Sequence, residues 1–416
     1  MNDMSTEFSY DPYAKDVLKN PLPYYRELLA NHPGYYVEKY DMFVFTRFQD
    51  IIDVLSVTND NTWMGSESTL PTPEVMAQIN HGAPPVPSTN PMAPGPTLPT
   101  PYYEEMRLSF MKPLRPKAVR AMQDRVRERT LELLRELLPK GRFDLAVDLG
   151  GMIAAFVTCD LYGIPQEQAR EVLDTVNGLS IYDEEKGKVD IPGLFDRLKG
   201  FIVPAVQRRR AAGANGDLPL IDPLINYRTP DDDRALSDEE IADQLTCVFV
   251  ANTETPPKPE ANGLLALHQH PDQLAAVRQN LETNVPIAVE EILRICTTPQ
   301  WTIRTAHKDT VVAGQSIKAG QRILVSPFAA ARDPREFENP EEFIWNRSIP
   351  RSVSFGFGRH HCVGNHIARM QVRTVVTEFL RHVKDYEFDL DSAYHSASYF
   401  HWGYMTMPVI IKDYEI

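Results

Sequence analysis

One cysteine stands in a setting that suits chemistry better than packing. Residues 355–364 read FGFGRHHCVG, so Cys362 directly follows two histidines, lies between glycines and precedes a helical pattern. A helix N-terminus offers free N–H groups and a favourable dipole, which stabilise a thiolate. A thiolate can act as a nucleophile, with His360 or His361 as its base. It can also bind iron, in which case the glycines would give a flat group close access.

The remaining cysteines do not share this setting. Cys159, Cys247 and Cys296 are widely separated along the chain, and no CxxC pair occurs. Neither a disulfide framework nor a zinc site is indicated by this spacing. We therefore interpret Cys362 as a free thiol that has a chemical function.

Composition limits the classes of protein that could carry this thiol. The chain has 416 residues, of which 43% are hydrophobic, and a net charge of −14. Such a charge argues against nucleic acid or an anionic membrane as the main partner. No basic segment followed by an apolar run opens the chain, and no stretch approaches ~18 consecutive apolar residues. We expect a cytoplasmic protein without a membrane segment.

Periodicity predicts a mainly α-helical fold with small β-sheets. Apolar residues recur at three- and four-residue intervals, as in amphipathic helices, in most of the chain. Predicted helices cover 11–32, 118–139, 238–252, 264–281, 286–296 and 366–383. Alternating or β-branched stretches predict strands within 34–47, 309–327 and 405–414, with turns near Gly314 and Gly320.

Two proline-rich segments interrupt this pattern. Prolines are dense from residue 71 to residue 101, which excludes a regular helix and predicts a long loop or lid. The second segment, TETPPKPE at 253–260, follows a helix that Ser237 and Glu240 should cap as a capping box. Because proline lacks the N–H of a helical hydrogen bond, this helix must kink or stop near Pro256.

The motif F-G-x-G-R-H-x-C-x-G, followed by NHIARM, resembles the haem-binding loop of the cytochrome P-450 superfamily. The resemblance implies the fold of that family, a triangular helical prism enclosing haem b, as a single domain over residues 1–416. It implies that Cys362 is the axial iron ligand and that His360 hydrogen-bonds a haem propionate. It also makes 71–101 a substrate-access loop, 237–262 an irregular oxygen-activation helix and 355–364 the haem-ligand loop.

Further motifs extend the resemblance over essentially the whole chain. EILR places Glu291 and Arg294 one helical turn apart, and the stretch ARDPREFENPEEFIWNR resembles the family's meander and supplies Arg347. Alone, the first two residues would be an exposed helix pair of small energetic value. With Arg347 and the haem loop, the resemblance implies a buried structural triad.

The same resemblance gives the expected contacts to haem. Arg304, in RTAHKDTVVAG, matches an arginine that meets a propionate, and Arg107, in TPYYEEMRLSF, matches a second one. Tyr103 occupies a place usually held by histidine or glutamine, and tyrosine can still donate a hydrogen bond to a carboxylate. Phe355 and Gly364 complete the predicted cofactor contacts.

The oxygen-activation helix departs from the family pattern A-G-x-[D/E]-T. Asn252 replaces the glycine, whereas Glu254 and Thr255 match the acid and the alcohol. The catalytic interpretation gives Thr255 the hydrogen bond to dioxygen, Glu254 the proton path and Asn252 a place in the oxygen groove. Two alternatives stay open: Thr255 caps a carbonyl freed by the prolines, or the register shifts so that Thr253 or Asn252 faces the iron.

The sequence indicates only the general class of the electron donors and of the substrate. No dinucleotide or iron–sulfur motif occurs in the chain, so a separate ferredoxin and ferredoxin reductase are implied. The basic stretch 112–129 is either a solvated helix face or a docking patch for that acidic partner. The resemblance also implies an apolar pocket for a small hydrophobic substrate. Its expected residues are Val248, Ala251, Trp301, Phe400, Trp402 and Tyr404.

Several functions remain open at this level. The first is a monooxygenase that hydroxylates a terpenoid or aromatic substrate; a weaker resemblance to guaiacol O-demethylase-like members adds O-dealkylation. The altered helix would also suit a haem-thiolate peroxygenase, or an isomerase or dehydratase. A haem sensor without turnover is a third class. A haem-free cysteine hydrolase would leave Arg304, Arg347 and the meander unexplained.

Overall fold

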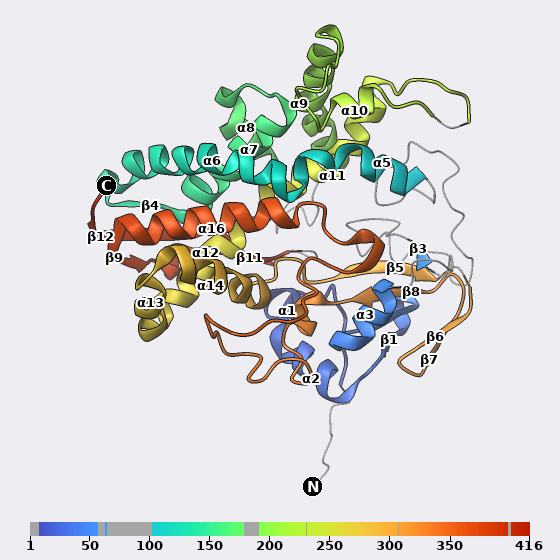
Figure 1. The fold of residues 1–416 in the computed structure, drawn as a ribbon. Coiled ribbons are helices and arrows are strands. Elements are labelled where there is room, and N and C mark those ends of the chain that lie inside the picture. Colours follow the sequence, from blue (N-terminus) through green and yellow to red (C-terminus); the bar gives the residue numbers. More distant parts are fainter. Residues whose placement is uncertain are drawn as a thin grey trace.

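The computed structural model describes residues 8–56, 63–64, 102–178, 191–229, 231–306, 308–397 and 401–416. The predicted loop at 71–101 and the predicted pocket residue Phe400 lie outside the described residues. Helices dominate the rest of the chain, as the periodicity predicts (Figure 1).

The described helices are spread over both halves of the chain. The first half contains α1 (Lys15–Lys19), α2 (Leu22–Asn31), α3 (Phe48–Ser56), α5 (Tyr102–Phe110), α6 (Pro116–Leu137), α7 (Met152–Tyr162), α8 (Ala169–Asn177) and α9 (Ile191–Ala211). The second half contains α10 (Asp222–Ile225), α11 (Asp238–Glu254), α12 (Pro257–Gln269), α13 (Pro271–Arg278), α14 (Leu281–Ile295), α15 (Pro327–Ala330) and α16 (Asn365–His382).

Local chemistry explains where these helices begin and end. The predicted capping box at the start of α11 is present: Ser237 Oγ accepts from the Glu240 N–H at 3.1 Å, and Glu240 Oε2 accepts from the Ser237 N–H at 2.8 Å. The predicted break near Pro256 is also confirmed, because α11 ends at Glu254 and α12 starts at Pro257. Prolines likewise divide the predicted helices 11–32 and 264–281 into two helices each.

Within the described residues, the strands form one larger sheet and three small ones. The larger sheet has the order β1 (Tyr35–Val37), β2 (Met42–Phe45), β8 (Arg322–Val325), β5 (Thr302–Ala306) and β3 (Trp63–Met64), with β2 and β8 parallel. The others pair β4 (Arg142–Asp144), β12 (Pro408–Tyr414) and β9 (Val383–Phe388), then β6 (Thr310–Val312) with β7 (Gln315–Ile317), and β10 (Tyr394–Ala397) with β11 (Trp402–Thr406). Gly314 and Gly320 have φ of 80° and 92°, so the two predicted turns are confirmed.

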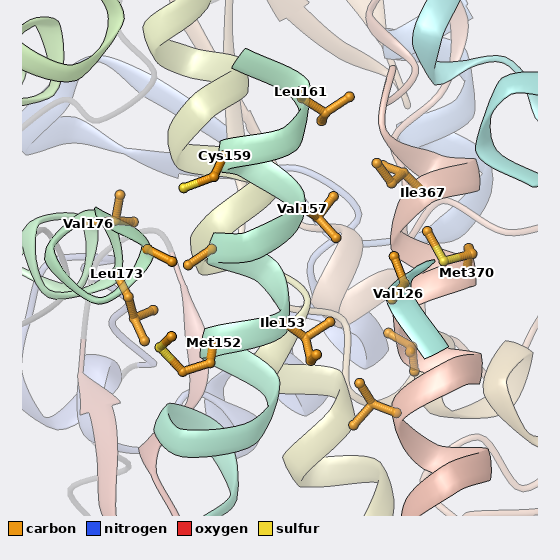
Figure 2. Packing of buried hydrophobic residues seen from close by; sticks show 14 of the residues in the cluster. Val126, Met152, Ile153, Val157, Cys159, Leu161, Leu173, Val176, Ile367 and Met370 are labelled. Atoms are coloured by element: carbon orange, nitrogen blue, oxygen red, sulfur yellow. The ribbon is translucent and has the colours of Figure 1, made fainter. Parts of the chain in front are cut away.

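The main hydrophobic core lies between the long helices. Figure 2 shows α7 at its centre, with Leu173 and Val176 of α8 on one side and Ile367 and Met370 of α16 on the other. The stretch Leu145–Tyr162, which contains α7, is apolar and long enough to cross a membrane, but 78% of it is buried inside the protein. It is therefore packed as the core helix of this fold.

Candidate functional site

The cysteine loop is folded tightly against its own helix. The Cys362 N–H donates to the Phe355 carbonyl at 2.8 Å, and Asn365 Nδ2 donates to the Cys362 carbonyl at 2.8 Å. Gly358 has φ +66°, and a Cβ there would lie 2.0 Å from the Leu55 carbonyl oxygen of α3. Glycine is thus required at 358 both by backbone conformation and by this close approach.

Cys362 opens on a cavity of ≈ 460 Å³ that gathers most of the predicted site. Twelve of the predicted residues line it: Tyr103, Arg107, Val248, Ala251, Asn252, Glu254, Thr255, Arg304, Phe355, His360, Cys362 and Gly364. Burial raises the pKa of the Cys362 thiol, and the Gly364 N–H and the guanidinium groups of Arg107 and Arg369 oppose that effect. An α-helix, α16, begins three residues after the sulfur.

A group of cationic and polar side chains lies at one end of the cavity. The Tyr103 and His360 rings pack against each other at an angle of 32° with centroids 4.4 Å apart, and Arg107 Nη1 donates to the Tyr103 hydroxyl at 3.0 Å. Arg107 Nη2 also donates to the His361 carbonyl. Tyr103 donates to the Arg359 carbonyl at 3.3 Å, so its hydroxyl braces the cysteine loop.

Arg304 brings a buried cation to the same end without a carboxylate partner among the described residues. Its hydrogen bonds go to the Ile303 carbonyl at 2.9 Å and to Thr302 Oγ1 at 3.2 Å. Burial lowers the pKa of Arg304 to about 10. Burial and the charges of Arg304 and Arg107 lower the pKa of His360 to about 3.

These donors fit an anionic cofactor edge. A buried guanidinium is costly unless it is paired with an anion, and arginine binds carboxylates through its planar fork. Two arginines, a histidine and a buried thiol around one apolar cavity match the propionates, the ring and the iron of haem. Gly364 fits as well, because a Cβ there would meet protein atoms only at 3.5 and 3.8 Å.

The predicted triad of Glu291, Arg294 and Arg347 is assembled away from the cavity. Arg294 donates through Nε and Nη2 to both oxygens of Glu291, at 2.6 and 2.8 Å, and Arg347 Nε lies 3.1 Å from each of them. Glu291 and Arg294 are 0% and 1% exposed. The remaining N–H groups of Arg294 and Arg347 donate to backbone carbonyls of the meander, Arg294 to Pro340 and Arg347 to Asn339.

Asn252 points its amide into the helix packing. Asn252 Nδ2 donates to Thr158 Oγ1 of α7 at 2.7 Å, and the Thr158 and Thr253 hydroxyls are 2.9 Å apart. Thr253 also donates to the Phe249 carbonyl at 2.9 Å. The two side chains thus tie α11 to α7, and Thr255, the residue at the break, borders the cavity.

Glu254 belongs to a buried ionic cluster that the sequence reasoning missed. His401 Nδ1 lies 2.8 Å from Glu254 Oε1, and Lys258 Nζ lies 3.3 Å from the same oxygen. Burial alone would raise the pKa of Glu254, but His401 and Lys258 overcome this and lower it to about 2. The Glu254–Lys258 spacing of one helical turn was a readable signal. His401 gave none, because it lies 147 residues away in sequence.

Three residues predicted to line the pocket do not line this cavity. Trp301 is 1% exposed and packs its ring 5.7 Å from that of Tyr13, away from the cavity. Strand alternation explains this, since its neighbours Thr302 and Arg304 take the cavity face. Trp402 packs against Phe328 and His395, and Tyr404 also packs against His395, so both cover protein instead of the cavity.

Comparison with known proteins agrees with this geometry. The family model described as cytochrome P450 matches residues 101–393, well over half of the chain. Cytochrome P-450 123 of Mycobacterium tuberculosis is 28% identical over 98% of both chains. The 6-deoxyerythronolide B hydroxylase of Saccharopolyspora erythraea is 30% identical over 65% of this chain and 66% of its own.

Solved structures share the fold over nearly the whole chain. P450BioI, in complex with a fatty-acyl carrier protein, has a TM-score of 0.81 at 22% identity and covers 96% of this chain and 99% of its own. The polyketide synthase cytochrome PksS of Bacillus subtilis 168 has a TM-score of 0.81 at 24% identity, covering 97% and 100%. The chain belongs to the cytochrome P-450 family and is a haem b monooxygenase of that family.

Proposed function

We propose that this chain, as one domain over residues 1–416, inserts one oxygen atom of dioxygen into a C–H bond of a small hydrophobic substrate. Two electrons and two protons reduce the second oxygen atom to water. The observation that carries the proposal is the single cavity in which Cys362, the propionate-type donors and the end of α11 meet. Haem, when bound there, supplies the activation of dioxygen.

The protein's part on the cysteine side is to hold the cofactor in one position. Cys362 would bind the haem iron through its sulfur, and Arg107, Arg304 and His360 would hold the propionates. Gly364 leaves room for the ring, and Phe355, which lies under Arg369 with the guanidinium 4.5 Å from its ring centroid, lines the thiolate side. The Tyr103 hydroxyl accepts a hydrogen bond from Arg107 and donates one to the Arg359 carbonyl of the loop, so it would position both.

The other side of the cavity must deliver protons and exclude water. Thr255, at the cavity wall, is assigned the hydrogen bond to dioxygen. Glu254 can exchange protons with Lys258 and His401, because both contact its Oε1. Asn252 takes a positioning role, since its bond to Thr158 fixes this end of α11.

Electrons are proposed to come from a ferredoxin, itself reduced by a ferredoxin reductase in the cytoplasm. Basic side chains of the 112–129 stretch are exposed, among them Lys112, Arg115, Lys117 and Arg120. Residues 116–129 of this stretch belong to α6, which packs against α16, the helix that follows the cysteine loop (Figure 1). That neighbourhood supports the docking interpretation, because an acidic protein would be steered toward the thiolate side.

The cavity wall supports a terpenoid or aromatic substrate. Besides Val248 and Ala251, its apolar members include Leu161, Phe195 and Leu293. Hydroxylation and O-dealkylation both start from attack on a C–H bond, so one cavity serves either outcome. Product analysis with a panel of terpenes and methoxyaromatics decides between them.

A peroxide-driven reaction, or an isomerase or dehydratase activity, is the second candidate function. The proline break and the ion-paired Glu254 favour it, because they restrict proton delivery. Turnover with hydrogen peroxide and without ferredoxin, at a rate exceeding ferredoxin-driven turnover, would replace the monooxygenase proposal. Ligand binding without any product would indicate a sensor.

The first test is the reduced, carbon monoxide-bound spectrum. Thiolate ligation predicts a band near ~450 nm. Cys362→Ser should lose it, whereas Cys247→Ser, a matched change at another cavity thiol, should keep it. Retention of the band in Cys362→Ser would remove the central assignment.

A further test addresses the proton path. Thr255→Ala should raise the share of electrons lost as hydrogen peroxide, measured against product formed per NADH. Unchanged coupling would favour a purely structural Thr255. Asn252→Gly should lower coupling if its bond to Thr158 positions α11, and improved coupling would mean that the amide obstructs the groove.

A further inference from the structure

The segment that follows α14 places two adjacent threonines at the cavity wall. Thr297 and Thr298 are 2% and 3% exposed, and both line the cavity. The Trp402 N–H donates to the Thr298 carbonyl at 2.8 Å, and Pro299 forms a backbone bridge with His401. The backbone of this segment is therefore held in place by the chain that enters β11.

The Thr297 hydroxyl is used within the protein. Its Oγ1 lies 2.9 and 2.7 Å from the carbonyl oxygens of Leu293 and Arg294 and 3.0 Å from Ser354 Oγ. Ser354 directly precedes the cysteine loop, so this side chain joins the end of α14 to that loop. A threonine hydroxyl has one proton to donate, and at Thr297 protein groups take it.

The Thr298 hydroxyl has no such partner. In the part of the chain that the structure describes, no donor or acceptor pairs with it. Fully enclosed hydroxyls without a partner occur in that part at Thr46 and Thr305, but Thr298 Oγ1 is not fully enclosed. Because Thr298 is almost wholly buried and lines the cavity, the surface that its oxygen keeps is cavity surface. The side chain therefore presents a hydroxyl to whatever fills the cavity.

Thr298 lies on the α11 side of the cavity. Its neighbour Pro299 bridges to His401, and the His401 ring contacts Glu254 at the end of α11. Thr297, in contrast, bonds toward the cysteine loop. The Thr298 hydroxyl is thus placed on the side proposed to receive dioxygen and substrate.

We propose that Thr298 is a specificity-determining residue that donates a hydrogen bond to a carbonyl oxygen of the substrate. The inference rests on the proposed function, because it names the substrate class for that same cavity: aromatic or alicyclic ketones. The cavity wall is mainly apolar. A carbonyl needs only a donor, so one hydroxyl satisfies it, whereas two hydroxyls paired with each other would leave one proton without an acceptor.

The experiment measures binding of two nearly isosteric ligands to the ferric holoenzyme. Isothermal titration calorimetry compares acetophenone with α-methylstyrene, in which a methylene group replaces the carbonyl oxygen. The Kd of α-methylstyrene divided by that of acetophenone should be about fivefold larger in the wild type than in Thr298→Val, in line with one buried hydrogen bond. Because the ligand and the protein each change by one group, the different hydration of the two ligands cancels in this comparison.

Two matched variants separate the hydroxyl from packing. Thr298→Ser keeps the hydroxyl and should keep the wild-type ratio. Thr297→Val removes a hydroxyl of the cavity wall that is already paired, so it should also keep the ratio. An equal ratio in wild type and Thr298→Val, or an equal decrease in Thr297→Val, overturns the inference.

The thiolate spectrum distinguishes failure of this inference from failure of the proposed function. That spectrum needs no organic ligand. A normal band combined with either overturning result rejects the role of Thr298 alone, and a missing band in the wild type rejects the proposed function instead.

A second measurement does not depend on a variant that folds. Infrared spectroscopy of carbon-13-labelled acetophenone bound to the wild type should show the carbonyl stretch at a lower frequency than in hexane, because a hydrogen bond to the oxygen weakens the C=O bond. A frequency equal to that in hexane would contradict donation by Thr298. In Thr298→Val the stretch should return to the hexane value, and a shift that persists there would assign the donor to another group.

Discussion

Two buried ionic clusters contain nearly the same residue types but differ in their position relative to the cavity. Glu291 and Glu254 each bind two basic side chains in the interior. The partners of Glu291 give their remaining N–H groups to meander carbonyls, and none of the three residues lines the cavity. Around Glu254, both the glutamate and His401 line the cavity. Residue types alone therefore do not distinguish a cluster within the core from one at the cofactor cavity; the position of the cluster relative to the cavity does.

The largest effect on stability is expected at the cluster around Glu291. Glu291→Gln should lower the free energy of unfolding by about 3–5 kcal/mol, because it leaves two buried guanidinium groups without an anion. Chemical denaturation measures it. Glu282→Gln is the control, since its bond to Arg381 is largely solvated and is worth about 0–1 kcal/mol. A loss below 1 kcal/mol at Glu291 would contradict the structural role.

Acid should weaken the cavity cluster by a comparable amount. Since the pKa of Glu254 is lowered to about 2 in the folded protein, its stabilisation is present above the unfolded pKa near 4.5 and is lost as pH falls toward 2. The full effect is about 3 kcal/mol. The difference in unfolding free energy between wild type and Glu254→Gln should shrink by about 1.4 kcal/mol per pH unit below 4.5. A difference that is independent of pH would show that Glu254 is not held as an ion.

A third buried glutamate sharpens the contrast, because it has no partner. Glu260 lies on α12, and neither of its carboxyl oxygens has a hydrogen bond within the described part of the chain. Burial raises its pKa well above the ordinary value. Glu260→Met should therefore raise the free energy of unfolding at pH 7, by about 1–3 kcal/mol.

The free energy of unfolding should depend on pH in the opposite direction at Glu260. A raised folded-state pKa means that its contribution is intact below about 4.5 and is lost as pH rises toward that folded value. Relative to Glu260→Gln, the wild type should thus lose stability on going from pH 4.5 upward, opposite to Glu254. If the free energies of unfolding of wild type and Glu260→Gln changed with pH in parallel, Glu260 would have a partner that stabilises its charge.

The smallest effect is expected at the solvent end of the same helix. Ser237→Ala should cost about 1 kcal/mol, because it removes the cap of α11. Glu239→Gln, at an exposed position in the first turn, should cost a few tenths at most. Chemical denaturation measures both changes, and a loss at Ser237→Ala no larger than that at Glu239→Gln would mean that the cap does not stabilise α11.

Much of the fold was readable in the sequence because its signals are local. The cap at Ser237, the break at Pro256 and the glycine turns depend on neighbouring residues only. The Glu291–Arg294 contact follows from helical spacing, and Arg347 was found through the family resemblance. The aromatic residues predicted to line the pocket lie elsewhere for a different reason. Pairing with distant strands determines the direction in which the Trp301 and Trp402 side chains point. His401 depends on the same long-range pairing.

The alternation along β5 links the start of the chain to the cofactor site. Trp301 and Ile303 pack in the N-terminal cluster with Tyr13, Tyr25 and Tyr40, whereas Thr302 and Arg304 face the cavity. This short segment therefore packs on aromatic side chains on one face and presents the arginine proposed to bind a propionate on the other. Retention of haem by the purified protein consequently reports on the packing of its first forty residues, although none of the described ones lines the cavity.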